Sequence, residues 1–385
     1  MSAFQRPALE LAEVVRRHAP RLDPELNGQQ KRILRAIASC RTAALGGHVE
    51  SCDHCSYRRI AYNSCRNRHC PKCQASACAR WMEDRAAELL EAEYFHVVFT
   101  LPDAFNALAL ANPRTVYGVL FEAAAQTLLE VAANPKHLGA RIGFLAILHT
   151  WGQNLSLHPH VHCVVPGGGI SPDGKWISCR PGFFLPVRVL SRVFRGKFID
   201  LLRRARTQGK LLGTEDEQVF ERLLDAAVKH EWVVYAKPPF GGPQQVLKYL
   251  SRYTHRIAIS NRRLLEIDNR TVTFAYKEYA HGNRPRRMTL SGEEFLRRFL
   301  LHAVPPGFMR IRQFGLLANR VRTENLQRCR RLIGTPTALP IELVTVSASS
   351  IEQPCCPACG QGRLRRGENL TPPELARLLR RLDSS

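Results

Sequence analysis

The chain has 385 residues, with 56 Lys and Arg against 33 Asp and Glu, so its formal net charge is +23. Such a balance predicts a polyanionic partner, with nucleic acid first and an anionic membrane surface second. No apolar run approaches the roughly 18 residues that a membrane span needs, and no signal-peptide core begins the chain. We therefore expect two or three domains in a cytoplasmic protein, nucleoid-associated when bound to DNA, without a membrane partner.

The first part of the chain reads as helix followed by a cysteine-rich stretch. Apolar residues recur at helical spacing up to Gly46-Gly47, which predicts an N-terminal helical segment over residues 1–45. Residues 46–85 are rich in Cys and His, and we expect a small zinc-binding module there. The chain has 13 cysteines, and in a reducing compartment clustered cysteines indicate metal rather than disulfides.

Two CxxC knuckles lie in this module, and each can offer two thiolates to one tetrahedral Zn²⁺. We expect one closed structural site and read the module as a DNA-binding or docking element, because such a site has no open position for chemistry. Three further candidates leave a second or shared site open, and the alternative is buried cysteines without a metal. The expected ligands are Cys52, Cys55, Cys70 and Cys73, and the further candidates are Cys65, His69 and Cys78.

Strand and helix patterns then alternate through residues 90–335, with a hairpin around Asp268-Asn269. This order favours an α+β fold over a doubly wound parallel sheet. Residues 336–385 read as a C-terminal tail with a lone CxxC, Cys356–Cys359, whose role the sequence leaves open. The expected strands are 95–100, 142–148, 160–165, 232–236, 264–267 and 271–276, and the expected helices are 114–133, 189–207, 215–230, one opening at 241–243, and 291–301 with Ser291 as N-cap.

The most informative motif is His160-Val161-His162, inside a β-branched run. On a strand both histidines point to one face while Val161 points to the other, so the pair could hold a divalent cation. Two histidines usually need a third protein ligand. His149 is our candidate because it ends the neighbouring expected strand, and Gln153 and His158 are alternatives. A half-buried polar face is the simpler reading of the pair.

Tyr249 and Tyr253 are four residues apart, a spacing that places both phenols on one face of a helix. Such a pair is often only packing. Beside a metal, a tyrosine can attack a scissile phosphate and form a covalent 5′-phosphotyrosine, and a second tyrosine permits a second strand transfer. Residues around the pair could contact flanking phosphates, although a solvated basic face is an equal alternative: Lys248, Arg252, His255 and Arg256.

Three stretches resemble the HUH endonuclease superfamily, and most closely the rolling-circle transposases of insertion-sequence family 91. They are His149–Cys163, Val165–Gly169 and Lys248–Arg256, and the segment Ser64–Cys73 is similar to that family's zinc-binding region. The resemblance implies an HUH palm, with a central antiparallel sheet and flanking helices, over residues 90–335 behind the zinc module. It also implies catalytic Mg²⁺ or Mn²⁺ and single-stranded DNA as substrate.

We therefore expect a metal-dependent tyrosine DNA endonuclease and strand transferase that acts as a transposase. A replication initiator or relaxase would use the same chemistry for another purpose. A non-catalytic zinc-finger DNA-binding protein would use the cysteine module and the basic surface but would need neither the histidines nor the tyrosines.

Overall fold

A computed structural model of the chain describes residues 9–237, 245–246, 257–278, 282, 284–334 and 355–382. Its centre is a five-stranded sheet in the order β12-β4-β5-β3-β8, in which every neighbouring pair is antiparallel. The expected α+β class with a central antiparallel sheet is confirmed. The strands are β3 (Tyr94–Thr100), β4 (Gly143–Trp151), β5 (Leu157–Pro166), β8 (Val234–Lys237) and β12 (Ile311–Gly315).

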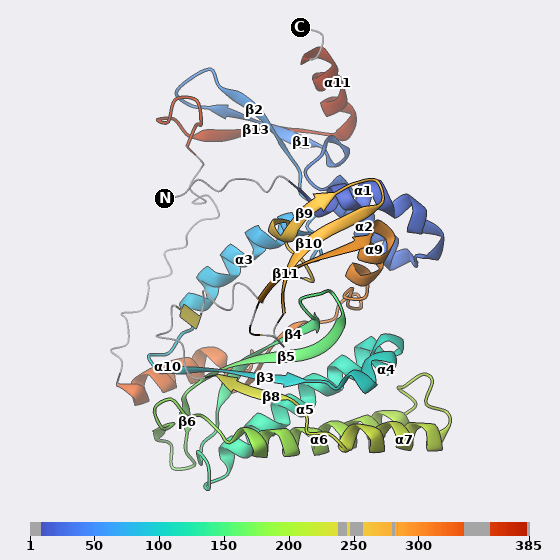
Figure 1. Cartoon of the computed structure of the whole chain (residues 1–385). Coiled ribbons are helices and arrows are strands. Elements are labelled where there is room, and N and C mark those ends of the chain that lie inside the picture. The colour runs from blue at the N-terminus through green and yellow to red at the C-terminus, as the bar shows by residue number, and fades with distance from the viewer. Residues whose placement is uncertain are drawn as a thin grey trace.

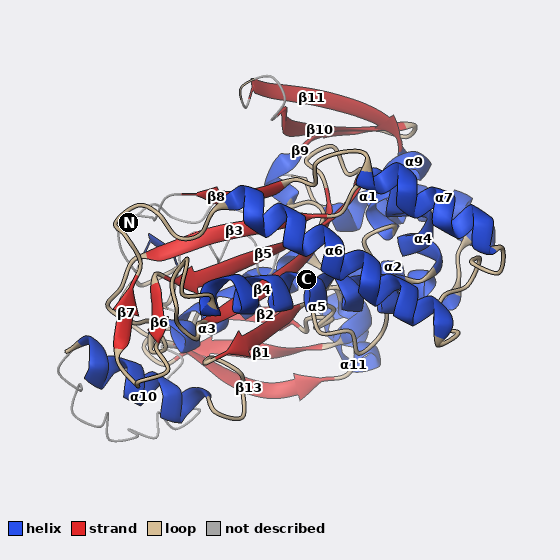
Figure 2. Cartoon of the chain, turned by 90° about the horizontal axis from the view of Figure 1, so that it is seen from below, coloured by secondary structure: helices blue, strands red, loops and turns tan. Residues whose placement is uncertain are grey.

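A layer of helices covers one face of this sheet, as Figures 1 and 2 show. Alternation along β5 sends Val161, Cys163 and Val165 into the main apolar cluster beneath them. One of these helices, α5, is long and apolar enough to cross a membrane by length and composition, contrary to our expectation, but 67% of its apolar window is buried. The helices are α4 (Asn106–Ala111), α5 (Pro113–Ala133), α6 (Val187–Thr207) and α7 (Glu217–Val228).

The opposite face of the sheet carries the alternate residues of the same strands. Leu145, Ile147 and Val164 form a small apolar cluster there with the buried side chain of Val246. Trp81 of helix α3 (Pro71–Ala86) packs against that cluster. This face is the one that carries the histidines described below.

The N-terminal helices share a core with a distant part of the chain. Helices α1 (Leu11–Leu22) and α2 (Gly28–Ser39) pack with α9 (Gly292–Leu300) and the three-stranded sheet β11-β10-β9. At Gly292 an added Cβ would lie 2.0 Å from His18 Nδ1, so glycine is required for this close approach. The expected hairpin and the Ser291 N-cap are both present. The strands are β9 (Leu264–Ile267), β10 (Thr271–Glu278) and β11 (Arg284–Ser291).

A third sheet joins the two ends of the chain, and its strand order is β13-β1-β2. Strand β1 (Gly47–Cys52) pairs with β2 (Arg58–Tyr62) on one side and with β13 (Leu364–Leu370) on the other. Figure 1 shows helix α11 (Pro372–Leu382) beside the same strands. The described residues beyond 355 thus belong to the N-terminal sheet, whereas we expected a separate tail. The remaining elements are β6 (Gly168–Ile170), β7 (Trp176–Ser178), α10 (Arg322–Ile333) and the short helices 23–25, 43–45, 103–105 and 261–263.

Gly315 gives a direct test of the edge pairing between β12 and β4. Its φ is +61° and an added Cβ would lie 2.0 Å from the carbonyl oxygen of Ile142, so Gly315→Ala adds a clash to backbone strain. At Gly307 φ is +72° with nothing within 4 Å, so Gly307→Ala adds strain alone. We expect a loss of unfolding free energy of about 1 to 2 kcal/mol for Gly307→Ala and about 2 to 5 kcal/mol for Gly315→Ala in urea titrations. Equal losses would contradict this arrangement.

Candidate functional site

Three histidines converge on the face of the central sheet opposite the helix layer α4–α7. His149 on β4 lies directly opposite His160 on β5 in the strand register, and His162 follows on the same face. One ring nitrogen from each lies within 4.8 Å of the others. His149 and His162 are only 3% and 7% exposed, while His160 is partly exposed and gives the cluster its access to solvent. The alternation of the strand and the antiparallel register together produce this cluster.

The spacing of the ring nitrogens fits a metal ion. His162 Nε2 lies 3.1 Å from His149 Nδ1. Metal–nitrogen bonds of about 2.1 Å place neighbouring octahedral ligands about 3 Å apart. We assign the proton of His160 to Nδ1, which donates to the carbonyl oxygen of His158 at 2.6 Å, so that Nε2 keeps its lone pair. The three side chains can therefore hold one cation and leave its other positions to water and substrate.

Two of the histidines, His160 and His162, are also in the protonation state that a metal requires. Burial lowers the pKa of His160 to about 4, with a smaller contribution from His158. Burial lowers the pKa of His162 well below its usual value, and the surrounding histidines act in the same direction. Neutral imidazole is the metal-binding form, so these side chains are ready to bind at neutral pH.

A fourth histidine, which the sequence analysis missed, touches the cluster from the neighbouring strand. His96 on β3 is 3% exposed, and its Nε2 lies 2.8 Å from His162 Nδ1. The two rings stack at 5.0 Å with 12° between their planes. If Nδ1 of His162 carries the proton, it donates a hydrogen bond to His96 Nε2, and Nε2 of His162 faces His149. The sequence does contain one signal for His96, because it is a single imidazole in the otherwise apolar run Tyr94–Phe99.

The alternatives to His149 as third member of the cluster lie differently. The side chain of His158 is 43% exposed, and its Nδ1 is 3.9 Å from an Asp103 carboxylate oxygen. Gln153 lies in the turn after β4, where its backbone carbonyl accepts a hydrogen bond from Arg263. Trp151 stacks on His149 at 4.4 Å and is 8% exposed, so it belongs to the core rather than to a base-stacking surface.

Both tyrosines lie outside the described residues, as do the basic residues proposed around them: Lys248, Tyr249, Arg252, Tyr253, His255 and Arg256. The described residues on either side of this segment are informative. Val246 is 1% exposed and packs on the histidine face with Ile147, while Ile257 is fully buried in the cluster that contains Trp151. Along β4, His149 lies between Ile147 and Trp151. The described residues on either side of the segment thus lie in the two apolar clusters that contain Ile147 and Trp151.

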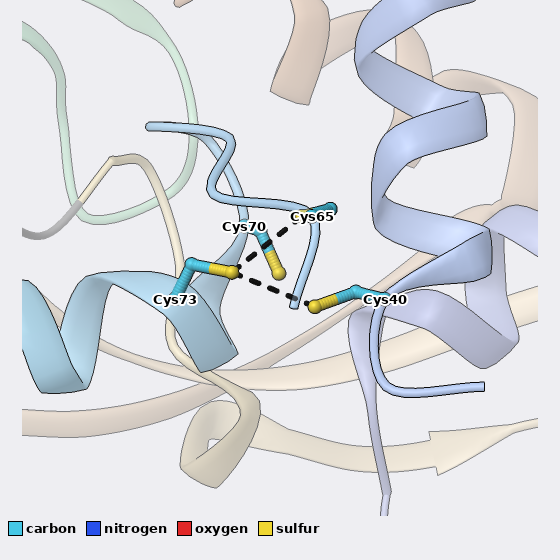
Figure 3. Close-up of side chains that lie close together, drawn as sticks. All are labelled: Cys40, Cys65, Cys70 and Cys73. Carbon is cyan, nitrogen blue, oxygen red and sulfur yellow. Dashed lines mark hydrogen bonds between the residues drawn. The ribbon is translucent and has the colours of Figure 1, made fainter. Parts of the chain in front are cut away.

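Four cysteines form a cluster at the junction of α2 and α3 (Figure 3). Cys40 is the C-cap of α2, Cys65 lies in the loop after β2, and Cys70 and Cys73 lie at the start of α3. The Sγ atoms of Cys40 and Cys65 are each 3.5 Å from Cys73 Sγ. The N-terminus of a helix favours negative charge, which suits thiolates at Cys70 and Cys73.

The expected single zinc site is wrong in its membership. Cys52 and Cys55 lie in a different cluster from Cys70 and Cys73, together with Cys356 and Cys359. Residues 56–69 between the knuckles form β2 and the loop after it, so Cys70 and Cys73 lie at the start of α3, away from the Cys52–Cys55 knuckle at the turn between β1 and β2. Of the further candidates, Cys65 joins the first cluster, whereas neither His69, whose Nδ1 contacts Asn67, nor Cys78 belongs to a cluster in the described residues.

The comparisons with known proteins agree with this architecture. A family model described as "Transposase zinc-binding domain" matches residues 13–101, and one described as "Putative transposase" matches residues 143–325. The chain is 54% identical over 379 residues to "Putative transposase y4qJ" of Sinorhizobium fredii, covering 93% of this chain and 95% of that protein. It is 30% identical over 302 residues to the transposase for insertion sequence element IS801 of Pseudomonas savastanoi pv. phaseolicola, covering 74% and 69%.

Solved structures give a more distant likeness. The conjugative relaxase TrwC in complex with oriT DNA, in its metal-bound form, matches with a TM-score of 0.25 and 13% identity over 62% of this chain and 71% of that one. The family models and the relatives define the class as a transposase with an N-terminal zinc-binding domain. The chain belongs to insertion-sequence family 91 of the two-tyrosine transposases, as its motifs indicated.

The first cysteine cluster can be tested with a matched pair of variants. Cys65→Ser removes one member, and we expect the full chain to lose one zinc ion and several degrees of thermal stability, because structural zinc binding is coupled to folding. Cys78→Ser alters a cysteine of α3 outside the clusters and should keep the zinc content unchanged. Zinc would be measured by inductively coupled plasma mass spectrometry, and a full zinc complement in Cys65→Ser would refute the assignment.

Proposed function

We propose that this transposase nicks and rejoins single-stranded DNA through a 5′-phosphotyrosine intermediate in rolling-circle transposition. Tyr249 or Tyr253 is the nucleophile, and His149, His160 and His162 hold Mg²⁺ or Mn²⁺. The observation that carries this proposal is the three-histidine cluster on the same sheet face that buries Val246, just before the tyrosines. A cation bound there would polarise the scissile phosphate and stabilise the leaving oxygen.

The chemistry conserves the phosphodiester bond energy. The tyrosine oxygen attacks phosphorus, the bond from phosphorus to the 3′ oxygen breaks, and the phenol proton ends on the released 3′ hydroxyl. A free 3′ hydroxyl can later attack the phosphotyrosine and reverse these changes, so rejoining needs no nucleotide cofactor. The second tyrosine permits another strand to be held while the first remains attached.

The charge distribution supports a DNA substrate. Beyond the net charge of +23, three arginines lie exposed on β11: Arg284, Arg286 and Arg287. Arg286 also pairs with Glu278, at 3.1 Å. Because these side chains are exposed, they can contact a phosphate backbone. Close to the tyrosines, we propose phosphate contacts from Lys248, Arg252, His255 and Arg256.

His96 provides a test of the metal site that does not depend on cleavage. We expect His96→Phe to weaken Mn²⁺ binding by about 10- to 100-fold, because His162 loses the partner that orients its ring. His96→Gln retains a hydrogen-bond acceptor and should recover part of that affinity. Binding would be measured by electron paramagnetic resonance of free Mn²⁺ on protein with a wild-type circular dichroism spectrum.

The matched control is His158→Ala, since the His158 side chain lies outside the cluster and its backbone carbonyl would still accept from His160. Its Mn²⁺ affinity should equal that of the wild type. Wild-type affinity in His96→Phe would show that His96 does not orient His162, and wild-type affinity in His160→Ala would remove the histidines as metal ligands.

The tyrosine assignment is tested by trapping the covalent product. With labelled single-stranded DNA bearing the element's ends, Tyr249→Phe and Tyr253→Phe together should abolish the protein–DNA adduct, since no phenol remains at the site. Either single variant should still form adduct at the remaining tyrosine. Mass spectrometry of the trapped peptide identifies the attached residue. Adduct in the double variant would exclude this mechanism, and DNA binding with no cleavage by the wild type would favour a non-catalytic zinc-finger protein.

A further inference from the structure

The second cysteine cluster combines residues from opposite ends of the chain. Cys52 Sγ lies 3.8 Å from Cys359 Sγ although the residues are 307 positions apart, and Cys55 Sγ lies 3.7 Å from Cys356 Sγ. All four sulfurs lie within 4.8 Å of one another. Zinc–sulfur bonds of about 2.3 Å place the sulfurs of a tetrahedron about 3.8 Å apart. The cluster therefore has the dimensions of a four-thiolate zinc site.

Backbone amides around the cluster donate hydrogen bonds to two of the sulfurs. The amide of His54 donates to Cys52 Sγ at 3.3 Å, and the amide of Gly362 donates to Cys359 Sγ at 3.4 Å. Such bonds stabilise the thiolate form that binds zinc. At Gly362 an added Cβ would lie 2.4 Å from Cys52 Sγ, so only glycine allows the two knuckles to approach this closely.

The two knuckles are also held together outside the sulfurs. Asp53 accepts from the Arg363 amide at 2.8 Å and from Arg365 Nε at 3.0 Å, and its own amide donates to the Arg363 carbonyl at 3.1 Å. In the strand register, Cys52 lies opposite Leu364. Polar contacts on this exposed surface contribute little to stability by themselves.

This sheet has less apolar support than the rest of the protein, although Leu364 and Leu375 are buried. None of the apolar clusters found in the described part of the chain includes a residue of β1, β2, β13 or α11. A small sheet without a core of its own usually needs a metal or disulfides. The sulfurs therefore supply, beside the backbone ladder between β13 and β1, a connection that apolar packing supplies only in small part.

We propose that Cys52, Cys55, Cys356 and Cys359 bind a second structural Zn²⁺, which fastens the C-terminal segment 355–382 to the N-terminal sheet. The zinc-binding region of this transposase is then not complete within residues 13–101, because half the ligands of this site come from the opposite end of the chain. The C-terminal knuckle Cys356–Cys359 thus supplies the second pair of ligands for the site to which Cys52 and Cys55 supply the first pair.

The test is the zinc content of the full chain, purified with a reductant and measured by inductively coupled plasma mass spectrometry. We expect two zinc ions per wild-type chain and one in Cys356→Ser. The neighbouring Cys355 is exposed and lies outside the cluster, so Cys355→Ser is the matched control and should keep two. One zinc in the wild type, unchanged by Cys356→Ser, would overturn the proposal.

Sharing of one ion between distant residues is tested by combining variants. Cys52→Ser alone should also leave one zinc, and Cys52→Ser with Cys356→Ser should still leave one, because both residues serve the same ion. If the double variant retains no zinc while each single variant retains one, Cys52 and Cys356 serve different ions and the shared site is wrong.

A measurement on the wild-type chain covers the case in which the variants do not fold. Thiol alkylation followed by peptide mass spectrometry should modify Cys355 rapidly, while Cys52 and Cys359 react only after a zinc chelator is added. Alkylation of Cys359 at the rate of Cys355 without chelator would overturn the site. A disulfide between Cys52 and Cys359 that persists in protein purified with a reductant would also overturn the site, because it would account for their proximity without a metal.

Discussion

The antiparallel pairing of β4 with β5 is the constraint on which the candidate active site depends. It places His149 opposite His160, and strand alternation adds His162 on the same face. A slip of β5 by one residue would turn His160 and His162 toward the apolar core and Val161 toward the opposite face, leaving His149 without its partners. The packing of Val161, Cys163 and Val165 under the helices therefore fixes the register that the histidines need.

The same pairing explains which parts of the site could be predicted from the sequence. The His160–His162 spacing encodes a shared face by itself, and the preceding strand pattern ending near His149 gave the third histidine. His96 could not be found in this way, because its strand pairs with β5 across a separation of 66 positions to His162. A residue recruited by such a long-range pairing leaves no local pattern.

The cysteines show the opposite case, in which each CxxC knuckle was recognised correctly but was assigned to the wrong partner knuckle. Both CxxC knuckles were recognisable, yet spacing does not say which knuckles share an ion. The two nearest knuckles along the chain, Cys52–Cys55 and Cys70–Cys73, are separated by β2 and the loop after it. Cys52–Cys55 clusters with Cys356 and Cys359, and Cys70–Cys73 clusters with Cys40 and Cys65. Cys40 had no CxxC neighbour to mark it, and it enters its cluster only because α2 ends beside the start of α3.

The distance along the chain also bears on why thiolates, rather than side-chain packing, would join the two ends. Closing a loop of about 300 residues costs about 5 kcal/mol in chain entropy. Exposed ion pairs such as the one between Asp53 and Arg365 contribute at most about 1 kcal/mol each. The buried side chain of Leu364 is a single apolar contribution from β13. Structural zinc in small modules binds with an apparent free energy of about 10 to 16 kcal/mol. Zinc binding is large enough by itself to exceed the closure cost, and it adds to the backbone ladder between β13 and β1 by joining both ends of the chain at one ion.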